Sequence, residues 1–324
     1  SAGAIIALSV FRDTVKNEDS FKNKIDAGLV GCILHEKKDF SIKEKFQKKK
    51  KGLLIGSNAF ISLRFIENFS KIAAKIEHAQ RQRGSQVFVV TSVSENEGKS
   101  TCAANIAVSL ANRGHNVVLV DLDGKKPALY KIFNQRHASG KELGDLLNKK
   151  ITPAEFKFKK CKKNSLLLAV NSKPCADCHK WFENGMAESF IAYLRKQVDY
   201  VIIDTSPFSM DASVTDVMSY ADETLLVVRT DRVATPVIND SVAIISKVSK
   251  NFMGCILNDV YPKFTPFIFS GNDQSKQYGR YGRYGKYGRY GKYGNYGHYG
   301  NYGRYGNYGN YGNYGNLTKE RAEK

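Results

Sequence analysis

Short apolar runs alternate with segments of helical periodicity through most of the chain. Runs rich in valine, isoleucine and leucine predict buried strands. These strands are expected at residues 86–92, 116–123, 166–170, 200–204, 224–229 and 253–260. Apolar residues recur at helical spacing between them, as at residues 99–113 and 187–196. Because buried strands that alternate with helices form parallel sheets, we predict an α/β fold, a mostly parallel sheet with helices on both faces.

An amphipathic helix is predicted before the first of these strands, over residues 59–76, with Gly84 as a stop signal beyond it. Its apolar face should pack on the core through Ile66, Phe69, Ile72, Ala73 and Ile76. Upstream, residues 12–56 are expected to form a basic linker with one short strand at 29–34. The folded domain is therefore predicted to span residues 57–262.

The first eleven residues are uncharged, and this stretch ends at Arg12. It is too short to cross a bilayer, which needs about 20 residues. It is either a local apolar run or the cytoplasmic end of a transmembrane helix that begins before Ser1, and we favour the second. Eight lysines between Lys37 and Lys51 support this choice, because a basic segment beside a membrane is attracted to anionic lipid.

Charge and composition change the picture most at the C-terminal end. The chain has 324 residues and a formal charge of +19, which favours an anionic partner. Thirteen Tyr-Gly units recur every three residues, with Arg, Lys, Asn or His between them. Such a segment cannot bury enough apolar surface to order itself, so residues 263–324 are predicted to be a disordered tail. The repeated tyrosines are Tyr278, Tyr281, Tyr284, Tyr287, Tyr290, Tyr293, Tyr296, Tyr299, Tyr302, Tyr305, Tyr308, Tyr311 and Tyr314.

Six cysteines are expected to be reduced thiols, because the chain shows no cleavable secretory signal. Cys175, Cys178 and His179 have the spacing of a c-type haem attachment site. We do not expect haem or a metal there, because haem attachment belongs outside the cytoplasm and no second ligand pair stands near the motif.

A phosphate-binding loop joins the strand at 86–92 to the helix that follows. It reads Ser-Glu-Asn-Glu-Gly-Lys-Ser-Thr over residues 94–101, and a strand-to-helix junction is the context that such loops require. Backbone amides and the helix N-terminus can hold the β- and γ-phosphates of a nucleotide, Lys99 adds a positive charge, and the Ser100 hydroxyl can bind Mg²⁺. The alternative is a capped turn in which Gly-Lys-Ser occurs by chance.

Three aspartates end two of the predicted strands. Asp121 and Asp123 are two residues apart, so both carboxylates are expected on one face of a strand, toward bound phosphates. Their alternative role is turn capping before Pro127. Asp204 stands where a carboxylate can orient a metal. With Lys99, these residues supply what phosphoryl transfer needs: neutralised phosphate charge, a placed metal and a base near the nucleophile.

Residues 89–107, 117–127 and 199–207 resemble the three Walker-type motifs of bacterial tyrosine autokinases (BY-kinases), which act in capsular and exopolysaccharide synthesis. The similarity extends to residues 254–258 and to the tyrosine-rich end. Residues 1–15 resemble the exit of the second membrane helix of a chain-length-determinant (Wzz-like) region fused ahead of the kinase. The resemblance implies a P-loop NTPase fold of the MinD/ParA-like type.

Carried over to this sequence, the resemblance implies binding of ATP phosphates by Glu97, Gly98, Lys99, Ser100 and Thr101. It implies catalytic roles for Lys99, Asp121 and Asp123, and Mg²⁺ binding by Ser100, Asp123 and Asp204. The implied phosphoacceptors are the thirteen tail tyrosines. In relatives, a neighbouring subunit in a ring phosphorylates the tail, and the phosphorylation state governs ring assembly and polymer export.

The chain departs from the family pattern at several positions. Relatives usually carry Pro-Gly where this chain has Glu95-Asn96. Asparagine tolerates the left-handed backbone that glycine provides, whereas Glu95 brings negative charge toward the phosphates. Of the three positions used for subunit contacts, here Asn58, Ile61 and Arg64, only Arg64 keeps the family residue. Ser206 stands where proline is usual.

We therefore predict an ATP-dependent protein-tyrosine autokinase at the cytoplasmic face of the bacterial plasma membrane, regulating chain length, polymerisation and export of a polysaccharide. Expected partners are further copies of the chain, a membrane chain-length-determinant region or separate activator, the export machinery and an anionic membrane surface, but not nucleic acid. One alternative is a MinD/ParA-like switch ATPase. Another is a catalytically weakened scaffold with a Tyr/Gly-rich interaction tail.

Overall fold

The computed structural model describes residues 13–36, 61–135, 142–152, 155–161, 165–175 and 178–261. Within them, eight strands form one sheet in the order β1-β8-β7-β2-β6-β3-β5-β4. Neighbouring strands run parallel except β4 and β5, which are antiparallel. The predicted mostly parallel sheet is therefore confirmed. The strands are β1 (Leu29–Leu34), β2 (Val87–Ser92), β3 (Val117–Asp121), β4 (Lys159–Lys160), β5 (Leu166–Ala169), β6 (Tyr200–Asp204), β7 (Glu223–Arg229) and β8 (Phe252–Val260).

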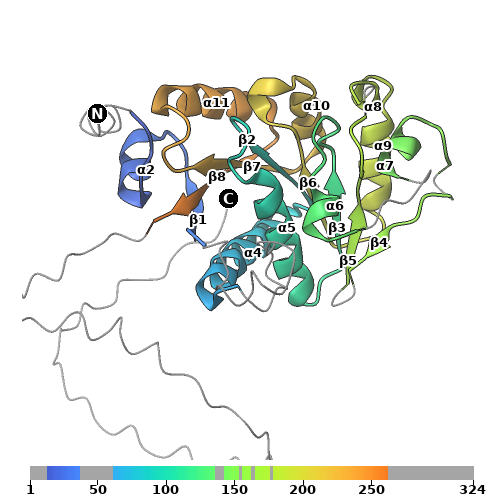
Figure 1. Ribbon diagram of the computed structural model, residues 1–324, viewed down its shortest axis with the longest axis horizontal. Helices are drawn as coiled ribbons and strands as arrows, with labels where there is room; N and C mark the ends of the chain where they lie inside the picture. The colour runs from blue at the N-terminus through green and yellow to red at the C-terminus, as the bar shows by residue number, and fades with distance from the viewer. Residues whose placement is uncertain are drawn as a thin grey trace, which may run out of the picture. The chain divides into compact units, whose positions relative to one another are not determined.

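Helices cover both faces of this sheet (Figure 1). Helices α4 and α5 pack against one face, and α9, α10 and α11 pack against the other. The helices are α2 (Glu18–Lys24), α4 (Leu63–Arg83), α5 (Lys99–Asn112), α6 (Leu129–Ile132), α7 (Leu143–Leu147), α8 (Lys180–Glu183), α9 (Met186–Leu194), α10 (Ser213–Tyr220), α11 (Thr235–Val248) and the 3₁₀ turn η1 (Phe208–Met210).

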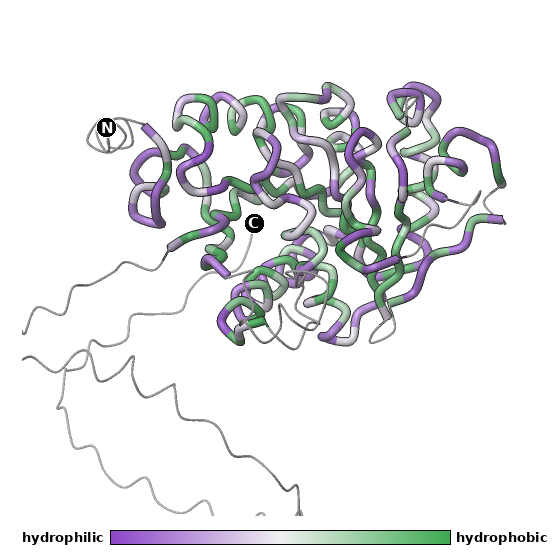
Figure 2. The backbone as a smooth tube through the Cα atoms, in the orientation of Figure 1, coloured by the Kyte–Doolittle hydropathy of each residue, from purple (hydrophilic) through white to green (hydrophobic). Residues whose placement is uncertain are grey.

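The central strands are buried on both sides, which explains why their sequences are apolar without alternation. In β2, Val87 and Val89 face one core and Phe88 and Val90 face the other, and all four are fully buried. The hydrophobic colouring accordingly runs through the middle of the sheet in Figure 2. The sheet therefore separates two hydrophobic cores, one on each of its faces.

Helix α4 confirms the predicted amphipathic helix but extends further toward its C-terminus. Four of the five expected residues are buried, with Ile72 and Ile76 at 0% exposure, whereas Ile66 is only half-buried. Gly84 ends the helix in the left-handed conformation, at φ 69°. Close packing on β1 depends on Gly31, because a Cβ there would lie 2.7 Å from Cγ1 of Ile72.

The predicted linker over residues 12–56 was wrong for residues 13–36, which fold with the domain. Helix α2 has an N-terminal capping box at Asn17 and buries Phe21 completely. The short strand predicted at residues 29–34 is confirmed as β1, which pairs in parallel with β8 and extends the sheet. The pairing of β1 with β8 and the burial of Phe21 therefore fix this segment in the domain, although its composition is polar.

Several expectations lie outside the described residues. These are the membrane-helix end at 1–11, the lysine-rich segment at 37–51, Asn58, and the tail with its thirteen tyrosines. No helix within the described ranges is long and apolar enough to span a bilayer. All six cysteines are free thiols.

Phe21→Ala tests whether residues 13–36 belong to the folded domain. Loss of a fully buried phenylalanine should lower the free energy of unfolding by about 3–5 kcal/mol. Urea denaturation followed by circular dichroism measures it. The exposed neighbour Lys22 is the control, and Lys22→Ala should change stability by less than about 0.5 kcal/mol. Equal stability of both variants would mean that the segment is a linker after all.

Candidate active site

A cavity of about 430 Å³ lies where β2, β3 and β6 end. Its walls come from residues 95–101, which include the first residues of α5, from residues 123–128 and 206–210 after β3 and β6, and from Ile132 in α6. The carboxyl ends of parallel strands are where ligands of such sheets bind. The sheet therefore brings the predicted phosphate loop and two of the predicted aspartates, Asp123 and Asp204, to one place.

The phosphate loop depends on two residues in the left-handed backbone conformation. Asn96 has φ 63° and Gly98 has φ 93°. The expectation that asparagine can replace the usual glycine at position 96 is thus confirmed. No side chain in the described part of the chain caps the N-terminus of α5, so its first amides remain available to an anion.

Two neighbouring strands support the loop from outside the cavity. Asn258, at the end of β8, donates through Nδ2 to the carbonyl of Glu97 at 2.8 Å, and a Cβ on Gly98 would collide with that amide at 2.3 Å. The buried Glu97 carboxylate accepts from the amides of Ser94 at 2.5 Å and Arg229 at 3.1 Å. Burial raises the pKa of Glu97. The side chain of Glu97 thus holds the loop in shape. Of the groups of Glu97, the backbone amide is the one that can donate to a phosphate, as the predicted phosphate binding requires.

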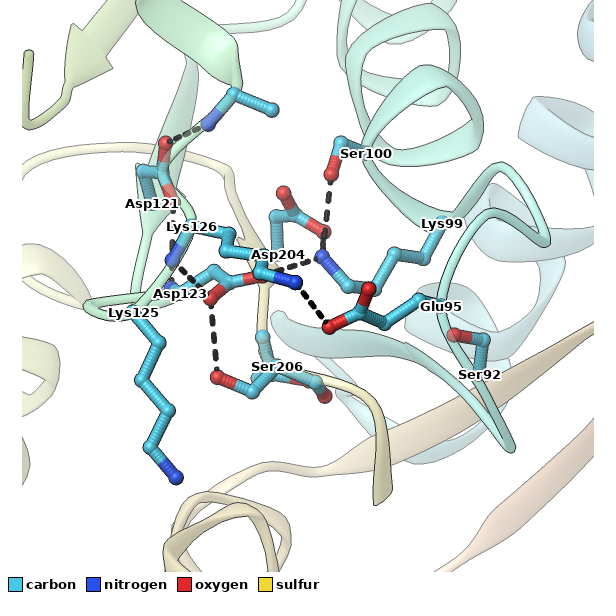
Figure 3. Close-up of polar contacts among 12 residues, drawn as sticks. Ser92, Glu95, Lys99, Ser100, Asp121, Asp123, Lys125, Lys126, Asp204 and Ser206 are labelled. Carbon is cyan, nitrogen blue, oxygen red and sulfur yellow. Dashed lines mark hydrogen bonds and ion pairs between the residues drawn. The ribbon is translucent and has the colours of Figure 1, made fainter. Parts of the chain in front are cut away.

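Lys99 lies between two carboxylates (Figure 3). Its Nζ is 2.7 Å from Oδ2 of Asp123 and 3.6 Å from Oδ1 of Asp204, and it also donates to the Ser100 hydroxyl at 3.3 Å. Burial lowers the pKa of Lys99, but Asp204 and Asp123 outweigh this effect, and the net pKa is raised. The lysine is therefore charged and neutralises this cluster.

The structure separates Asp121 from Asp123, which were expected on one face of a strand. Strand β3 ends at Asp121, paired with Asp204, and Asp123 lies in the following loop. Asp121 is fully buried and accepts hydrogen bonds from the amides of Asp123, Ala128 and Leu129. Burial and the Asp204 carboxylate raise the pKa of Asp121 well above its ordinary value. Asp123 lines the cavity, whereas Asp121 organises the loop that carries it.

Ser206 holds the Asp123 carboxylate from the opposite side of the cavity. Its buried hydroxyl donates to Oδ1 of Asp123 at 3.1 Å, and the amide of Lys126 donates to the same oxygen at 2.9 Å. With Lys99 on Oδ2, both carboxylate oxygens are fixed. In the sequence, Ser206 stands out only as a departure from the family pattern. A polar residue directly after an apolar strand could have indicated that Ser206 contacts the site.

The carboxylate of Asp204 is buried, and neither of its oxygens has a hydrogen-bond partner among the described residues. Burial raises the pKa of Asp204 to about 6. A buried carboxylate without donors fits a cation, and with the Ser100 hydroxyl and Asp123 it makes the all-oxygen set that Mg²⁺ prefers. Among the described residues, no three His, Cys, Asp or Glu side chains are placed to hold a metal together, so the Ser100 hydroxyl is the third oxygen of this set.

The negative charge of Glu95 is compensated at the rim of the cavity. Oε1 of Glu95 lies 2.5 Å from Nζ of Lys126, as Figure 3 shows. Lys125 extends away from the carboxylate cluster in the same view and pairs with Asp211 at 3.2 Å. Each rim lysine is thus matched by one acid.

The cysteine motif touches the same loops. The amide of Cys175 donates to the carbonyl of Gly124 at 2.8 Å. A Cβ on Gly124 would lie 2.3 Å from Cβ of Cys178, so the glycine allows close packing. These contacts support the loop that follows Asp123.

Comparison with known proteins places this site in a family. The family model described as "ParA: NUBPL iron-transfer P-loop NTPase" matches residues 84–266, more than half of the chain. This fold implies nucleotide binding with a divalent metal.

Two relatives carry tyrosine-protein kinase names. "Tyrosine-protein kinase CpsD" of Streptococcus agalactiae is 27% identical over 215 residues, which cover 64% of this chain and 88% of that protein. A protein of Klebsiella pneumoniae whose name assigns it to the tyrosine-protein kinases of a cps region is 26% identical over 200 residues. That match covers 62% of this chain but only 27% of the Klebsiella protein.

A solved structure shares the fold. The kinase domain of the Escherichia coli tyrosine kinase ETK superposes with a TM-score of 0.64 and 16% sequence identity. The superposition covers 76% of this chain and 95% of that domain. The predicted P-loop NTPase fold and the resemblance to bacterial tyrosine kinases are therefore confirmed.

Asp204→Asn tests the buried carboxylate through the pH dependence of stability. The native pKa of about 6 lies above the ordinary 3.8, so between these values the folded protein holds a proton that the unfolded chain releases. Stability without metal or nucleotide should therefore fall as pH rises from about 4 to about 6, with up to about 3 kcal/mol from this group. The substitution should flatten the slope in urea titrations. The exposed Asp240→Asn should leave the slope unchanged, and equal slopes for wild type and Asp204→Asn would contradict the assignment.

Proposed function

Because the chain belongs to the ParA family of P-loop NTPases, we propose that its nucleotide site serves an ATP-dependent protein-tyrosine autokinase whose acceptors are Tyr278 to Tyr314. The contact that carries the proposal is the buried cluster of Lys99, Asp123 and Asp204 beside the uncapped N-terminus of α5. The names of the relatives support the reaction, and the Tyr-Gly repeats supply acceptors on the same chain.

In the proposed mechanism, Lys99 exchanges one anionic partner for another. An incoming triphosphate competes with Asp123 for the ammonium group, and Oδ2 of Asp123 then loses its donor. Bound Mg²⁺, held by Ser100 and Asp204, would supply neutralising charge on the phosphates, which leaves Oδ2 of Asp123 free to accept a proton. The tyrosine oxygen attacks the γ-phosphorus, the bond from that phosphorus to the β–γ bridging oxygen breaks, and the phenol proton passes to Asp123. Phosphotyrosine and ADP are the products.

The wider setting is proposed on the same basis. We propose that residues 1–11 end a membrane helix, that the lysines at 37–51 meet anionic lipid, and that the domain works at the cytoplasmic face of the membrane. The partners would be further copies of the chain, a chain-length-determinant region or separate activator, and polysaccharide export machinery. Phosphorylation would reverse the charge of the basic tail, since each phosphate adds nearly two negative charges.

A switch ATPase is the second candidate, and the family match itself favours it. Its nucleotide site needs the same lysine and aspartates but has no use for thirteen tail tyrosines. The two functions differ in product, because a switch ATPase releases inorganic phosphate without phosphotyrosine.

Lys99→Met tests the autokinase directly. Removing the ammonium group that neutralises the phosphates should lower phosphotyrosine formation at least about a hundredfold, measured by mass spectrometry after incubation with Mg-ATP. Lys196, exposed after α9, provides the matched control, and Lys196→Met should label like the wild type. Circular dichroism establishes that both variants fold. Undiminished phosphotyrosine in Lys99→Met would contradict the assignment of an autokinase. Release of inorganic phosphate by the wild type without any phosphotyrosine would establish the switch ATPase.

Ser206→Ala tests the hydrogen bond that positions Asp123. Without the hydroxyl, Oδ1 keeps only the Lys126 amide, so the carboxylate is less well placed and kcat should fall roughly tenfold. The KM for ATP should change less than twofold, because the Ser206 hydroxyl donates its hydrogen bond to Asp123 and belongs to no part of the phosphate loop. Ser206→Thr retains a hydroxyl and should restore most of the rate. A fall in both the alanine and the threonine variants would indicate a packing role instead.

A further inference from the structure

A second cavity, of about 460 Å³, lies at the opposite edge of the sheet from the nucleotide site. Four basic residues of α4 line it, Lys75, His78, Arg81 and Arg83, and none of its described lining residues is acidic. Met253, the second residue of β8, also lines it. The cavity therefore lies where the strands begin, whereas the phosphate loop follows the end of β2. We call it the basic cavity.

Two of the positive charges in the basic cavity have no acidic partner in the described part of the chain. Nζ of Lys75 donates to the backbone carbonyl of Leu29 at 3.4 Å, and Arg81 forms no hydrogen bond or ion pair with another described residue. Arg83 differs, because its Nε and Nη2 lie 2.8 and 2.7 Å from Oε1 of the buried Glu223. The charges of Lys75 and Arg81 are therefore available to a ligand.

The spacing along α4 brings these groups to one face of the helix. Lys75, His78 and Arg81 recur every three residues, and residues three apart are neighbours on a helix surface. Interaction with the helix dipole explains a basic residue in the last turn, where Arg81 lies. It does not explain Lys75, which lies more than one turn earlier. An anion between Lys75 and Arg81 would neutralise both charges.

The remaining lining of the basic cavity is apolar. It comes from Ala74, Ala79 and Met253. Ala79 is buried and Met253 is half-buried, so their side chains present apolar surface beside the basic groups. A thioether adapts to the shape of an organic group. A ligand that carries an anionic group on an apolar body therefore matches this lining better than a bare inorganic ion does.

We propose that the basic cavity binds a soluble organic phosphate, whose phosphate group contacts Lys75 and Arg81 and whose apolar body contacts Met253. Arginine binds phosphate through paired N–H groups, and lysine binds it as a point charge. His78 adds a ring N–H donor. Binding here does not depend on the proposed kinase reaction, because the two cavities lie at opposite edges of the sheet.

The path of the chain favours a soluble ligand over the headgroup of a membrane lipid. The segments that we propose to meet the membrane join the domain at the carboxyl edge of the sheet. The amide of Thr235, beyond the end of β7, donates to the carbonyl of Asp13 at 2.8 Å, and the amide of His35 donates to the carbonyl of Val260, at the end of β8, at 2.8 Å. The basic cavity lies at the other edge.

Protection of Lys75 from acetylation tests the proposal in the full-length chain. The probe is phenyl phosphate, which carries a phosphate group on an apolar ring. A brief pulse of acetic anhydride, followed by mass spectrometry of the peptides, reports the acetylated fraction of each lysine at each probe concentration. Lys75 should become protected, whereas Lys150, exposed after α7, should not. Because the readout is local, binding of the probe to the phosphate loop does not disturb it.

Arg81→Gln should raise the phenyl phosphate concentration for half-protection of Lys75 roughly tenfold, because it removes the paired N–H donors. Lys150→Gln is the control, since it removes one positive charge outside the cavity, and it should change that concentration less than twofold. Circular dichroism establishes that both variants fold. Arg83 is left intact, because its loss would leave the Glu223 carboxylate buried without a cation.

Three results would overturn parts of the proposal. An unchanged half-protection concentration in Arg81→Gln, or equal protection of Lys150 and Lys75, would overturn the site itself. Inorganic phosphate should need a concentration at least about threefold higher than phenyl phosphate, because it gains no apolar contact, and equal concentrations would overturn the organic body. Protection of Lys75 by vesicles of phosphatidylglycerol and phosphatidylcholine, but not by phenyl phosphate, would overturn the soluble source.

Discussion

The ion pair between Lys99 and Asp123 is the interaction on which the site depends. Three carboxylates, of Asp121, Asp123 and Asp204, are buried at the ends of neighbouring strands, and Lys99 is the cation that contacts two of them. Burying like charges without compensation costs several kcal/mol per ion. Lys99 therefore serves as the internal counterion of this buried cluster.

The loops around this pair are held by strands that contribute no chemistry of their own. Arg229 from β7 and Asn258 from β8 fix the phosphate loop, and Ser206 after β6 fixes Asp123. Parallel pairing aligns all these strand ends at one edge of the sheet. Hydrogen bonds between the loops thus hold a few polar atoms in fixed positions relative to the rigid sheet. Phosphoryl transfer requires such fixed positions.

The sheet, its two buried faces and the phosphate loop could be predicted because each follows from local sequence: continuous apolar runs, helical spacing and a Gly-Lys-Ser junction. Residues 13–36 could not, since the burial of Phe21 and the pairing of β1 with β8 depend on partners far away in the sequence. The same limit explains the aspartates. Spacing placed Asp121 and Asp123 on one strand face, but the strand ends at Asp121 because its pairing with β6 ends there. Ser206, Arg229 and Asn258 were missed as site residues because their roles are contacts between loops.

The nucleotide core alone does not distinguish a kinase from a switch ATPase, because both need Lys99 and the same aspartates. What distinguishes this chain lies at the cavity mouth and in the tail. The rim charges are paired, the exposed Met210 is held beside the loop that contains Asp123, and a basic tyrosine repeat stands on the same polypeptide. A switch needs none of these features, whereas a kinase that phosphorylates its own tail needs acceptor tyrosines and an entrance whose charges do not repel a basic segment. The family match therefore establishes the machinery, and the case for tyrosine as its substrate rests on the entrance and the tail together with the relatives' names.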